Sequence, residues 1–348
     1  MTTLGTVRRR RRVGLLALLA LLALAALASV ALGARAIAPG TVYEAVAHAL
    51  GCADGPFTCP AASTTEEIVR GLRIPRTALA LVAGLALGAT GALIQGYTRN
   101  PLADAGLLGL NSGAAFLAAL SVYLFAFTDP EQYIWFAMAG ALLAGLAVFG
   151  ASSLGGGKAS PLSLVLAGTA MTAFLQAMTQ AVVLFDATAL DTYRFWVVGT
   201  VAGRDAAVFW QVLPFIAVGA VLATAAAPGL NLLGLGDDVA RGLGMNIARS
   251  RALGFTAVVL LCGAATSAVG PIAFLGLVVP HIARAFTGPD HRWLIPYSAL
   301  LGAVLLLCAD TLGRIVARPG ELQVGVMLAV VGAPYFIALV RRRKLVSL

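Results

Sequence analysis

Residues 73–113, RIPRTALALVAGLALGATGALIQGYTRNPLADAGLLGLNSG, carry the pattern that decides the fold. A run of 22 residues from Thr77 to Thr98 contains no Asp, Glu, Lys or Arg, and a polar turn with a proline follows it at residues 99–104. A helix needs about 20 apolar residues to cross the hydrocarbon core of a membrane. Because glycine-rich apolar sequence resumes after the turn, the stretch predicts one membrane span, a polar turn and the start of a second span.

The composition of the whole chain agrees with this pattern. Of its 348 residues, 60% are hydrophobic and 11% are charged, whereas an ordinary soluble domain has about 25% charged residues. The net charge of +9 is typical of membrane proteins, whose basic residues gather in cytoplasmic loops, and the sequence has no separate basic domain that would bind a nucleic acid. We therefore expect an all-α, polytopic membrane protein with a single transmembrane domain over residues 1–348.

The apolar runs predict about ten transmembrane helices with both termini in the cytoplasm. Their expected positions are about 13–34, 77–98, 105–127, 133–153, 161–184, 207–227, 252–269, 272–287, 293–311 and 322–340. The uncharged run over residues 252–282 is divided into two spans because Gly270-Pro271, near its middle, is a strong helix breaker. A single span there would leave nine spans and would put the basic residues 341–344 outside, against the tendency of Lys and Arg to stay in the cytoplasm.

Five consecutive arginines, Arg8 to Arg12, precede the first apolar run, and we expect a cytoplasmic basic N-terminus at residues 1–12. The same pattern occurs in cleaved export signals, including twin-arginine signals. Because the uncharged run from Val13 to Ala34 has 22 residues, longer than the roughly 7 to 15 residues of a signal core, we favour a retained first span.

Three short patterns could suggest chemistry within the chain. The GGGK at residues 155–158 lacks the earlier glycine and the following Ser or Thr of a phosphate-binding loop, so we expect no nucleotide site. His281 has no histidine or carboxylate three or four residues away, which favours a structural hydrogen bond over a proton carrier or ligand. Cys52 and Cys59 lie in a polar segment where a local disulfide is plausible if that segment is external. The expected protein is therefore not an enzyme and holds no cofactor or metal of its own.

Residues 234–251 form the longest expected cytoplasmic connection. Asp237 and Asp238 lie near a helix start, where acidic groups are favourable, and Gly242 and Gly244 then end the helix. The pattern predicts a short amphipathic helix on the cytoplasmic face. Such a helix is either a plain surface loop or the element through which a soluble motor moves the membrane helices.

Several short segments of the sequence resemble the motifs of one protein family and occur in the same order as in that family. RIPR, GALIQG, RNPLAD and LLGLNSGAA, then GPIAFLGLVVPHIAR and DHR, and finally ELQVGVMLAVVGAPYFIALV resemble the FecCD-type permease subunits of bacterial ATP-driven importers for ferric siderophores, haem and cobalamin. The resemblance runs from about Arg73 to Leu339. It implies a fold like that of the cobalamin importer permeases and a multi-pass location in the bacterial cytoplasmic membrane. It also implies that ATP and Mg²⁺ are held by a partner ATPase and not by this chain.

The resemblance further implies partners and sites. The partners are ABC ATPase subunits, a second permease subunit that is either a copy or a paralogous chain, an extracytoplasmic substrate-binding protein, and membrane lipids, with no nucleic acid. The implied site residues are Arg73, Arg76 and Arg314 for docking of the binding protein; Asn100, Pro101, Leu102, Ser160 and Pro161 for a cytoplasmic gate; Leu235, Gly236, Asp237, Ala240, Leu243 and Gly244 for coupling to the ATPase; and Met171, Gln176 and Gln180 for the pathway.

The residues themselves leave other interpretations open. Arg73 and Arg76 could be interfacial anchors, and Arg314, four residues after Asp310, could form an ion pair with it. The amides of Gln176 and Gln180 could face a pathway or bond to a neighbouring helix, and the residues do not decide between the two.

Three classes of protein compete. An ion-coupled secondary transporter usually carries ionisable or unwound polar sites at mid-membrane, but apart from Asp310 the expected spans hold no acidic residue. An intramembrane enzyme needs a paired acid, base or metal set, and the sequence suggests none. An ATP-driven importer permease fits best, because its work arrives from another subunit. Residues 191–205, DTYRFWVVGTVAGRD, resemble siderophore permeases more than cobalamin permeases. A ferric siderophore is therefore the expected substrate, with haem and cobalamin as alternatives.

Overall fold

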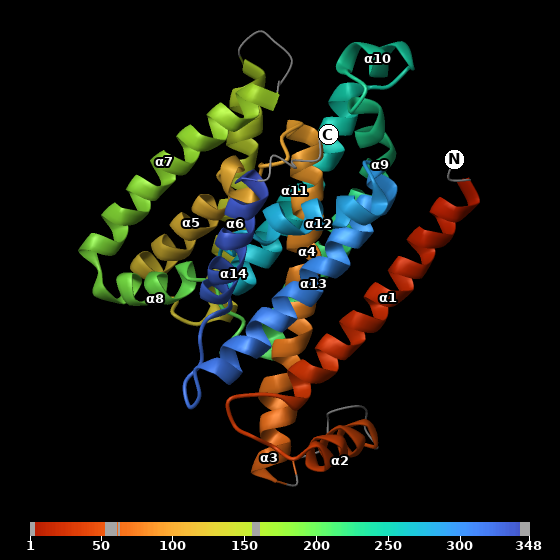
Figure 1. Ribbon diagram of the computed structural model, residues 1–348. Coiled ribbons are helices and arrows are strands. Elements are labelled where there is room, and N and C mark those ends of the chain that lie inside the picture. The colour runs from red at the N-terminus through yellow and green to blue at the C-terminus, as the bar shows by residue number, and fades with distance from the viewer. Residues whose placement is uncertain (1–3, 53–60, 62, 155–160, 342–348) are drawn as a thin grey trace.

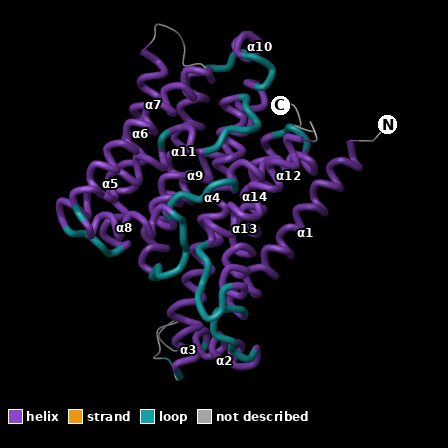
Figure 2. The backbone as a smooth tube through the Cα atoms, turned by 60° about the vertical axis from the view of Figure 1, so that its left-hand side comes forward, coloured by secondary structure: helices purple, strands orange, loops and turns teal. Residues whose placement is uncertain are grey.

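The computed structural model describes residues 4–52, 61, 63–154 and 161–341. Within this part of the chain every regular element is a helix, as Figure 2 shows. The apolar helices are α1 (Leu4–Ala31), α4 (Ile74–Thr98), α5 (Leu110–Phe125), α6 (Pro130–Leu154), α7 (Pro161–Phe185), α9 (Ala206–Leu233), α11 (Ile247–Val269), α12 (Leu275–Thr287), α13 (His291–Val316) and α14 (Val324–Arg341). Seven of them are long enough to cross a membrane, and α5, α12 and α14 are shorter. The prediction of an all-α polytopic membrane protein with about ten apolar helices is confirmed.

Short helices flank this bundle. They are α2 (Pro39–Leu50), α3 (Thr64–Glu67), the π-helix η1 (Ile68–Arg73), the 3-10 turn η2 (Ala105–Leu108), α8 (Ala187–Val197) and α10 (Asp237–Gly242). In Figure 1, α10, the start of α1 and the end of α14 lie toward one end of the bundle, and α2 and α3 lie at the opposite end. We call these the α10 end and the α2 end.

Backbone geometry explains where the boundaries agree with the sequence and where they differ. Gly270 adopts a φ of 78° and ends α11 after Val269, so two helices occupy the long uncharged run, as predicted. The expected third span starts at residue 105, but α5 starts at Leu110 because Gly109, with a φ of 73°, separates it from η2. The expected seventh span starts at residue 252, but α11 starts earlier because the side chain of Asn246 caps it by accepting from the amide of Arg249 at 3.0 Å.

Helix α4 is the central element of the fold. It packs against α13, α11, α9 and α12. Glycines on α4 allow backbones to meet closely: a Cβ atom on Gly84 would lie 2.5 Å from the Cα of Ala303, and one on Gly88 would overlap the carbonyl of Ser298. Small residues at such contacts are typical of membrane helices, where close backbone approach replaces the hydrophobic driving force. The glycines of α4 therefore let its backbone pack directly against that of α13.

Helix α1 lies at the edge of the bundle along α13 (Figure 1). Near its start, the backbone carbonyl of Arg11 accepts a hydrogen bond from the hydroxyl of Tyr297. Near its end, the hydroxyl groups of Ser29 and Thr77 lie 2.8 Å apart. The first span is thus bonded to the bundle near both of its ends.

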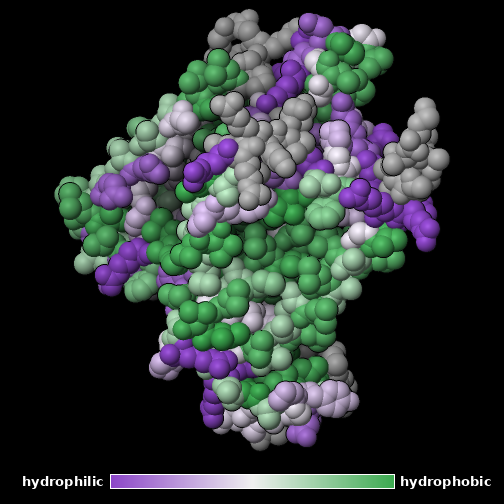
Figure 3. Space-filling model, viewed as in Figure 1, coloured by the Kyte–Doolittle hydropathy of each residue, from purple (hydrophilic) through white to green (hydrophobic). Residues whose placement is uncertain are grey.

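On the face shown in Figure 3, apolar residues dominate the middle of the bundle and hydrophilic residues are more frequent toward its two ends. At the α2 end, Cys52 follows α2 and is disulfide-bonded. Cys59, the partner considered from the sequence, lies outside the described residues.

Candidate functional site

The α2 end contains a cavity of about 350 Å³. Its walls come from the segment after α1, from η1 and the start of α4, from the loop before α9, and from α13 with the loop that follows it. The charged residues of the wall are Arg35, Arg73, Arg76, Arg204, Asp205, Arg314 and Glu321. All three arginines that the sequence assigned to docking therefore line one cavity with an excess of positive charge.

Arg73 is turned inward, toward the end of α1. Only 5% of it is exposed. Its guanidinium donates to the carbonyl oxygens of Val30 at 3.0 Å, Ala31 at 2.7 Å and Arg35 at 2.5 Å. The last carbonyls of a helix have no partner within the helix and carry partial negative charge. Arg73 thus caps α1 at the α2 end, and its docking role stays a prediction.

Asp310 lies at the centre of a buried ion-pair cluster with two arginines of the cavity wall, Arg76 and Arg314. Asp310 is 1% exposed. Its Oδ1 lies 2.7 Å from Nη2 of Arg76, and its Oδ2 lies 3.0 Å from Nη2 of Arg314. Arg76 also reaches Glu321, with 2.6 Å between Nη1 and Oε2. The ion pair that the spacing of Asp310 and Arg314 suggested is present, and it joins α4, α13 and the loop before α14.

Two further arginines at the cavity were not assigned a role from the sequence. Arg35 is exposed, and Nη1 of Arg204 donates to the hydroxyl of Tyr133 at 2.6 Å. Nε of Arg204 is buried and has no hydrogen-bond partner among the described residues. No local motif marks either residue, since they reach the cavity only because α1, α4 and the loop before α9 meet there.

At the α10 end, α4 leads into the inner turn that the sequence assigned to a gate. Arg99 ends α4 in the left-handed region, with a φ of 50°. The side chain of Asn100 accepts from the amide of Leu102 at 2.9 Å and so closes the turn around Pro101. Asp104 then caps η2 by accepting from the amide of Ala105 at 2.7 Å. The turn is therefore held by its own side chains.

The inner turn is joined to α7 through η2. The hydroxyl of Thr172 lies 3.3 Å from the carbonyl oxygen of Gly106, to which it donates, and Gly168 packs against the carbonyl of Leu107. Of the two other residues assigned to the gate, Pro161 is the first residue of α7 and Ser160 lies outside the described residues.

Asp237, the first residue of α10, connects this helix to the bundle. Its Oδ1 lies 2.6 Å from Nη2 of Arg99, and its Oδ2 lies 2.8 Å from Nη2 of Arg251 on α11. Burial alone would raise the pKa of the Asp237 carboxyl, but the charges of Arg251 and Arg99 outweigh burial and lower this pKa below its ordinary value. The sequence did not predict Arg99 and Arg251 as partners of Asp237, because no sequence motif links either arginine to it.

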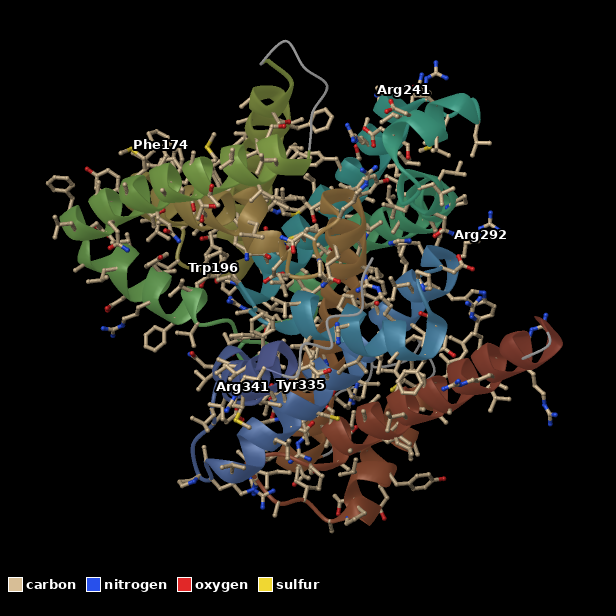
Figure 4. The ribbon with its side chains drawn as sticks, turned by 45° about the horizontal axis from the view of Figure 1, so that its top comes forward. Phe174, Trp196, Arg241, Arg292, Tyr335 and Arg341 are labelled. Atoms are coloured by element: carbon tan, nitrogen blue, oxygen red, sulfur yellow. The ribbon has the colours of Figure 1, made fainter. Side chains whose placement is uncertain are left out.

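The rest of the predicted coupling segment divides into buried and exposed residues. Ala240 is buried, whereas Leu235 is 62% and Leu243 is 61% exposed. Gly236 and Gly244 adopt φ values of 107° and 80°, which L side chains rarely adopt, so they set the two ends of the short helix. The exposed leucines form an apolar surface at the tip of the α10 end, where Figure 4 shows Arg241 pointing away from the bundle.

The residues assigned to the pathway lie on α7. Gln176 and Gln180 are exposed, and neither amide has a hydrogen-bond partner among the described residues. Met171 is half-buried beside Gly109. Phe174 is exposed on the outer side of the same helix (Figure 4). In this chain the two amides therefore lie on an open helix face and do not bond to a neighbouring helix of the described part.

His281 is buried on α12. Its Nδ1 has no hydrogen-bond partner in the part of the chain that the structure describes, so the predicted structural hydrogen bond is not found there. Among the described residues no group of three or more His, Cys, Asp or Glu could hold a metal ion.

Comparisons with known proteins give these sites a context. The FecCD transport family matches residues 21–342. The ferric enterobactin transport system permease protein FepD of Escherichia coli is 43% identical over 312 residues, covering 90% of this chain and 90% of that protein. The iron(3+)-hydroxamate import system permease protein FhuB of Bacillus subtilis is 40% identical, covering 90% of this chain and 79% of that protein.

Other matches agree with these two. The hemin transport system permease protein HmuU of Yersinia pestis is 38% identical, covering 78% of this chain and 83% of that protein. A solved inward-facing structure of a metal-chelate type ABC transporter superposes with a TM-score of 0.80 at 25% identity, covering 94% of this chain and 98% of that one. With the whole bundle from α4 to α14 inside the matched region, this chain belongs to the FecCD transport family.

Proposed function

We propose that this chain is the permease subunit of an ATP-binding-cassette importer that moves a ferric siderophore across the bacterial cytoplasmic membrane. The observation that carries the proposal is the position of α4 between two sites. Arg76, in its first turn, lies in the outer cavity, and Arg99, at its end, bonds to Asp237 of α10. One central helix thus joins a surface suited to a delivering partner with a surface suited to a motor.

The α10 end is the cytoplasmic end in this proposal. Its basic residues include Arg9 to Arg12 on α1 and Arg341 at the end of α14. Lys and Arg residues near membrane spans remain preferentially in the cytoplasm. The α2 end, with its disulfide-bonded Cys52, then faces outward, which agrees with the oxidising compartments where disulfides persist.

The cavity at the α2 end receives the substrate-binding protein. Its arginine-rich wall would attract acidic side chains of that partner and raise the rate of encounter. Because Arg73 and Arg314 already bond within the chain, we propose that they shape the cavity and its positive field. The exposed Arg35 offers a direct contact to a docked protein, whereas Arg76 already pairs with Asp310 and Glu321.

The apolar tip of α10 receives the ATPase. Leu235, Val239 and Leu243 are exposed beyond the membrane-spanning helices, where water would otherwise cover them. The bonds of Asp237 to Arg99 and Arg251 would pass a movement of α10 to α4 and α11. ATP and Mg²⁺ are held by that ATPase, and this chain supplies no nucleotide site, cofactor or catalytic group.

The exposed face of α7 lines the pathway together with a second permease subunit. Gln176 and Gln180 present amides on this face, and Met171 lies nearer the inner turn. The gate at the cytoplasmic side would consist of Asn100, Pro101 and Leu102 with the start of α7 at Ser160-Pro161. We propose this arrangement for either a homodimer or a pair of paralogous chains.

A ferric siderophore is the substrate we propose, with haem and cobalamin as alternatives. Relatives named for ferric enterobactin, iron(3+)-hydroxamate and hemin are 43%, 40% and 38% identical. These identities are too similar to decide between the three substrates. We therefore propose the substrate type of the relative with the highest identity among these three, which is named for ferric enterobactin.

Uptake in a permease-deletion strain tests the proposal. The chain would be expressed with its ATPase and binding protein, and cells would receive radiolabelled iron as ferric enterobactin, radiolabelled haem or radiolabelled cobalamin. We expect ATP-dependent uptake of the siderophore-bound iron. Uptake of haem or cobalamin alone would change the substrate. Uptake that survives ATP depletion and stops when the ion gradient is collapsed would refute an ATP-driven importer.

A further inference from the structure

The start of α1 carries an arginine segment outside the region that the family shares. Arg9, Arg10, Arg11 and Arg12 lie on α1, whereas the family match begins at residue 21. The four side chains are not equivalent. Arg9, Arg10 and Arg12 are exposed and make no hydrogen bond or ion pair with any described residue, whereas Arg11 is half-buried.

Arg11 fixes the rotation of α1 at this end. Its Nη2 donates to the carbonyl oxygen of Thr287 at 2.5 Å, and its Nη1 lies 3.5 Å from Oδ2 of Asp290. Its guanidinium also lies 5.8 Å from the centre of the Trp293 ring. These partners lie at the end of α12, in the turn that follows it and in the first turn of α13.

This anchoring decides where the other arginines lie. Successive residues of a helix are about 100° apart around its axis, so Arg10 and Arg12 lie on the two flanks of α1 and Arg9 lies nearly opposite Arg11. On the neighbouring helix, Arg292 is also exposed, and Figure 4 shows it at the start of α13, on the side of the bundle where α1 begins. Arg11 thus faces the carboxylate of Asp290, whereas Arg9, Arg10, Arg12 and Arg292 leave four exposed guanidinium groups at the starts of α1 and α13.

The depth of this cluster in the membrane follows from the helix length. Residues 13–31 rise about 28 Å at about 1.5 Å per residue, close to the roughly 30 Å of a hydrocarbon core. Leu16, Leu24 and Leu27 on this stretch are 66%, 63% and 67% exposed, so the face of α1 opposite α13 lies against lipid chains. The arginines directly before Val13 therefore lie in the lipid headgroup layer at the α10 end of the bundle.

We propose that Arg9, Arg10, Arg12 and Arg292, here called the α1 arginine surface, bind the headgroups of anionic phospholipids of the inner leaflet. Guanidinium groups bind phosphate oxygens through two parallel hydrogen bonds, and exposed basic clusters next to a membrane span are typical of anionic lipid binding. The lipids would neutralise charges that have no partner among the described residues. Bound lipids would also hold α1 against the α12–α13 turn. The proposed function enters this inference only through the assignment of the α10 end to the cytoplasmic leaflet.

A lipid fits this surface better than a protein partner does. The exposed apolar face of α1 continues directly into the arginines, so acyl chains would lie beside them in a membrane. The apolar tip of α10, proposed for the ATPase, is a separate surface in both Figure 1 and Figure 2. An acidic segment of another protein is therefore the alternative that the test must exclude.

The test uses the full-length chain in lipid nanodiscs and in native mass spectrometry. Phosphatidylglycerol binding would be compared with phosphatidylcholine binding for the wild type, for R9Q/R10Q/R12Q, and for R9K/R10K/R12K. The control R241Q/R249Q/R341Q removes three exposed arginines from the same end of the bundle. None of the substituted side chains on α1 is buried, so the fold should persist, and size-exclusion chromatography would confirm it.

We expect the wild type and the control to retain phosphatidylglycerol, and the glutamine variant to bind it about five-fold more weakly for each arginine removed. The lysine variant should recover most of the binding, because the attraction is chiefly electrostatic. Equal retention of the two lipids by the wild type, or an equal loss in the control, would overturn the proposal. So would unchanged lipid binding with a loss of binding to the ATPase subunit. None of these readouts depends on transport, so failure of the proposed function would be seen separately.

Discussion

The carboxylate of Asp237 accepts a hydrogen bond from the guanidinium of Arg99, with 2.6 Å between Oδ1 and Nη2. The two residues are 138 positions apart in the sequence, and they join the start of α10 to the end of the central helix α4. The same guanidinium donates to the carbonyl oxygen of Leu233 at 2.6 Å, so Arg99 holds both sides of the connection between α9 and α10. A displacement of α10 therefore acts directly on the inner turn at Asn100.

Substitution of Asp237 by Asn is expected to weaken coupling. The variant keeps the shape of the side chain but loses its charge, and a partly exposed ion pair contributes about 1 kcal/mol, or about five-fold in an equilibrium. We expect uptake to fall about five-fold while ATP hydrolysis by the partner continues. Asp238→Asn is the matched control, because the Asp238 carboxylate is almost fully exposed and bonds only to Arg241, within α10. Equal uptake in the two variants would contradict the coupling role.

The pH dependence of the same interaction follows from the lowered pKa of Asp237. A carboxyl group whose pKa is lower in the folded state stabilises the protein above its ordinary pKa of about 3.9. This stabilisation is lost only as the pH falls through the lowered, folded value. The difference in thermal stability between the wild type and D237N should therefore stay constant from about pH 5 to pH 8. A difference that disappears near pH 6 would show that another group controls the contact.

Gly236 and Gly242 provide a test of backbone geometry at the two ends of α10. A Cβ atom at either position would meet open space, but Gly236 has a φ of 107° and Gly242 is helical. Holding a residue with a side chain at such an angle costs about 1–3 kcal/mol. Gly236→Ala should therefore displace α10 and reduce uptake more than ATP hydrolysis. Gly242→Ala should preserve uptake, and similar defects in both variants would argue that the Cβ atom itself disturbs the ATPase contact.

Substitution of Asp310 is expected to lower the free energy of unfolding more than substitution of any other described acidic residue. Removing its charge leaves Arg76 and Arg314 without their shared buried carboxylate, and breaking a buried ion pair in this way costs about 3–5 kcal/mol. Asp310→Asn should lower the thermal unfolding temperature of the purified permease accordingly. Asp191→Asn is the control, because its pair with Arg194 is 61% and 58% exposed and should contribute less than about 1 kcal/mol. Comparable shifts would show that the buried cluster does not stabilise the fold.

The sequence predicted the membrane helices well because their signals are local. The uncharged run before Thr98 and the Gly270-Pro271 breaker each act within a few residues, and α4, α11 and α12 follow from them. The sites depend on contacts between distant segments. Arg73 stands before a span, where an arginine can face water or turn inward, and it turns inward because the carbonyls of α1 lie within reach 42 positions earlier at Ala31.

Helix α10 shows the same division between features predicted from local sequence and features set by contacts with distant segments. The sequence predicted a short helix at this place, and the positive φ values of its glycines agree with that prediction. Its partners Arg99 and Arg251 could not be predicted, because their positions depend on how α4 and α11 pack. The amphipathic pattern predicts that the helix exists, but only the packing of the bundle determines which residues it contacts.

Docking of the binding protein is best tested at Arg35. Arg73 is less suitable, because Arg73→Glu would place a carboxylate against the carbonyls of Val30 and Ala31 and is expected to destabilise the fold. Arg35 lines the same cavity, is exposed, and has no side-chain hydrogen bond to another described residue. Reversing its charge should weaken binding of an acidic partner by about 1–2 kcal/mol, or about ten-fold, without a change in thermal stability.

The control for this variant is Arg194→Glu, which reverses an exposed charge on α8 outside the cavity wall. Affinity would be measured with the purified binding protein at two salt concentrations, because an electrostatic contact weakens as salt screens it. We expect a loss of affinity and of its salt dependence for Arg35→Glu only. An equal loss in both variants would mean that the general charge of this end attracts the partner. Unchanged affinity in Arg35→Glu would move the docking contact away from the cavity, toward the surface around α2 and α3.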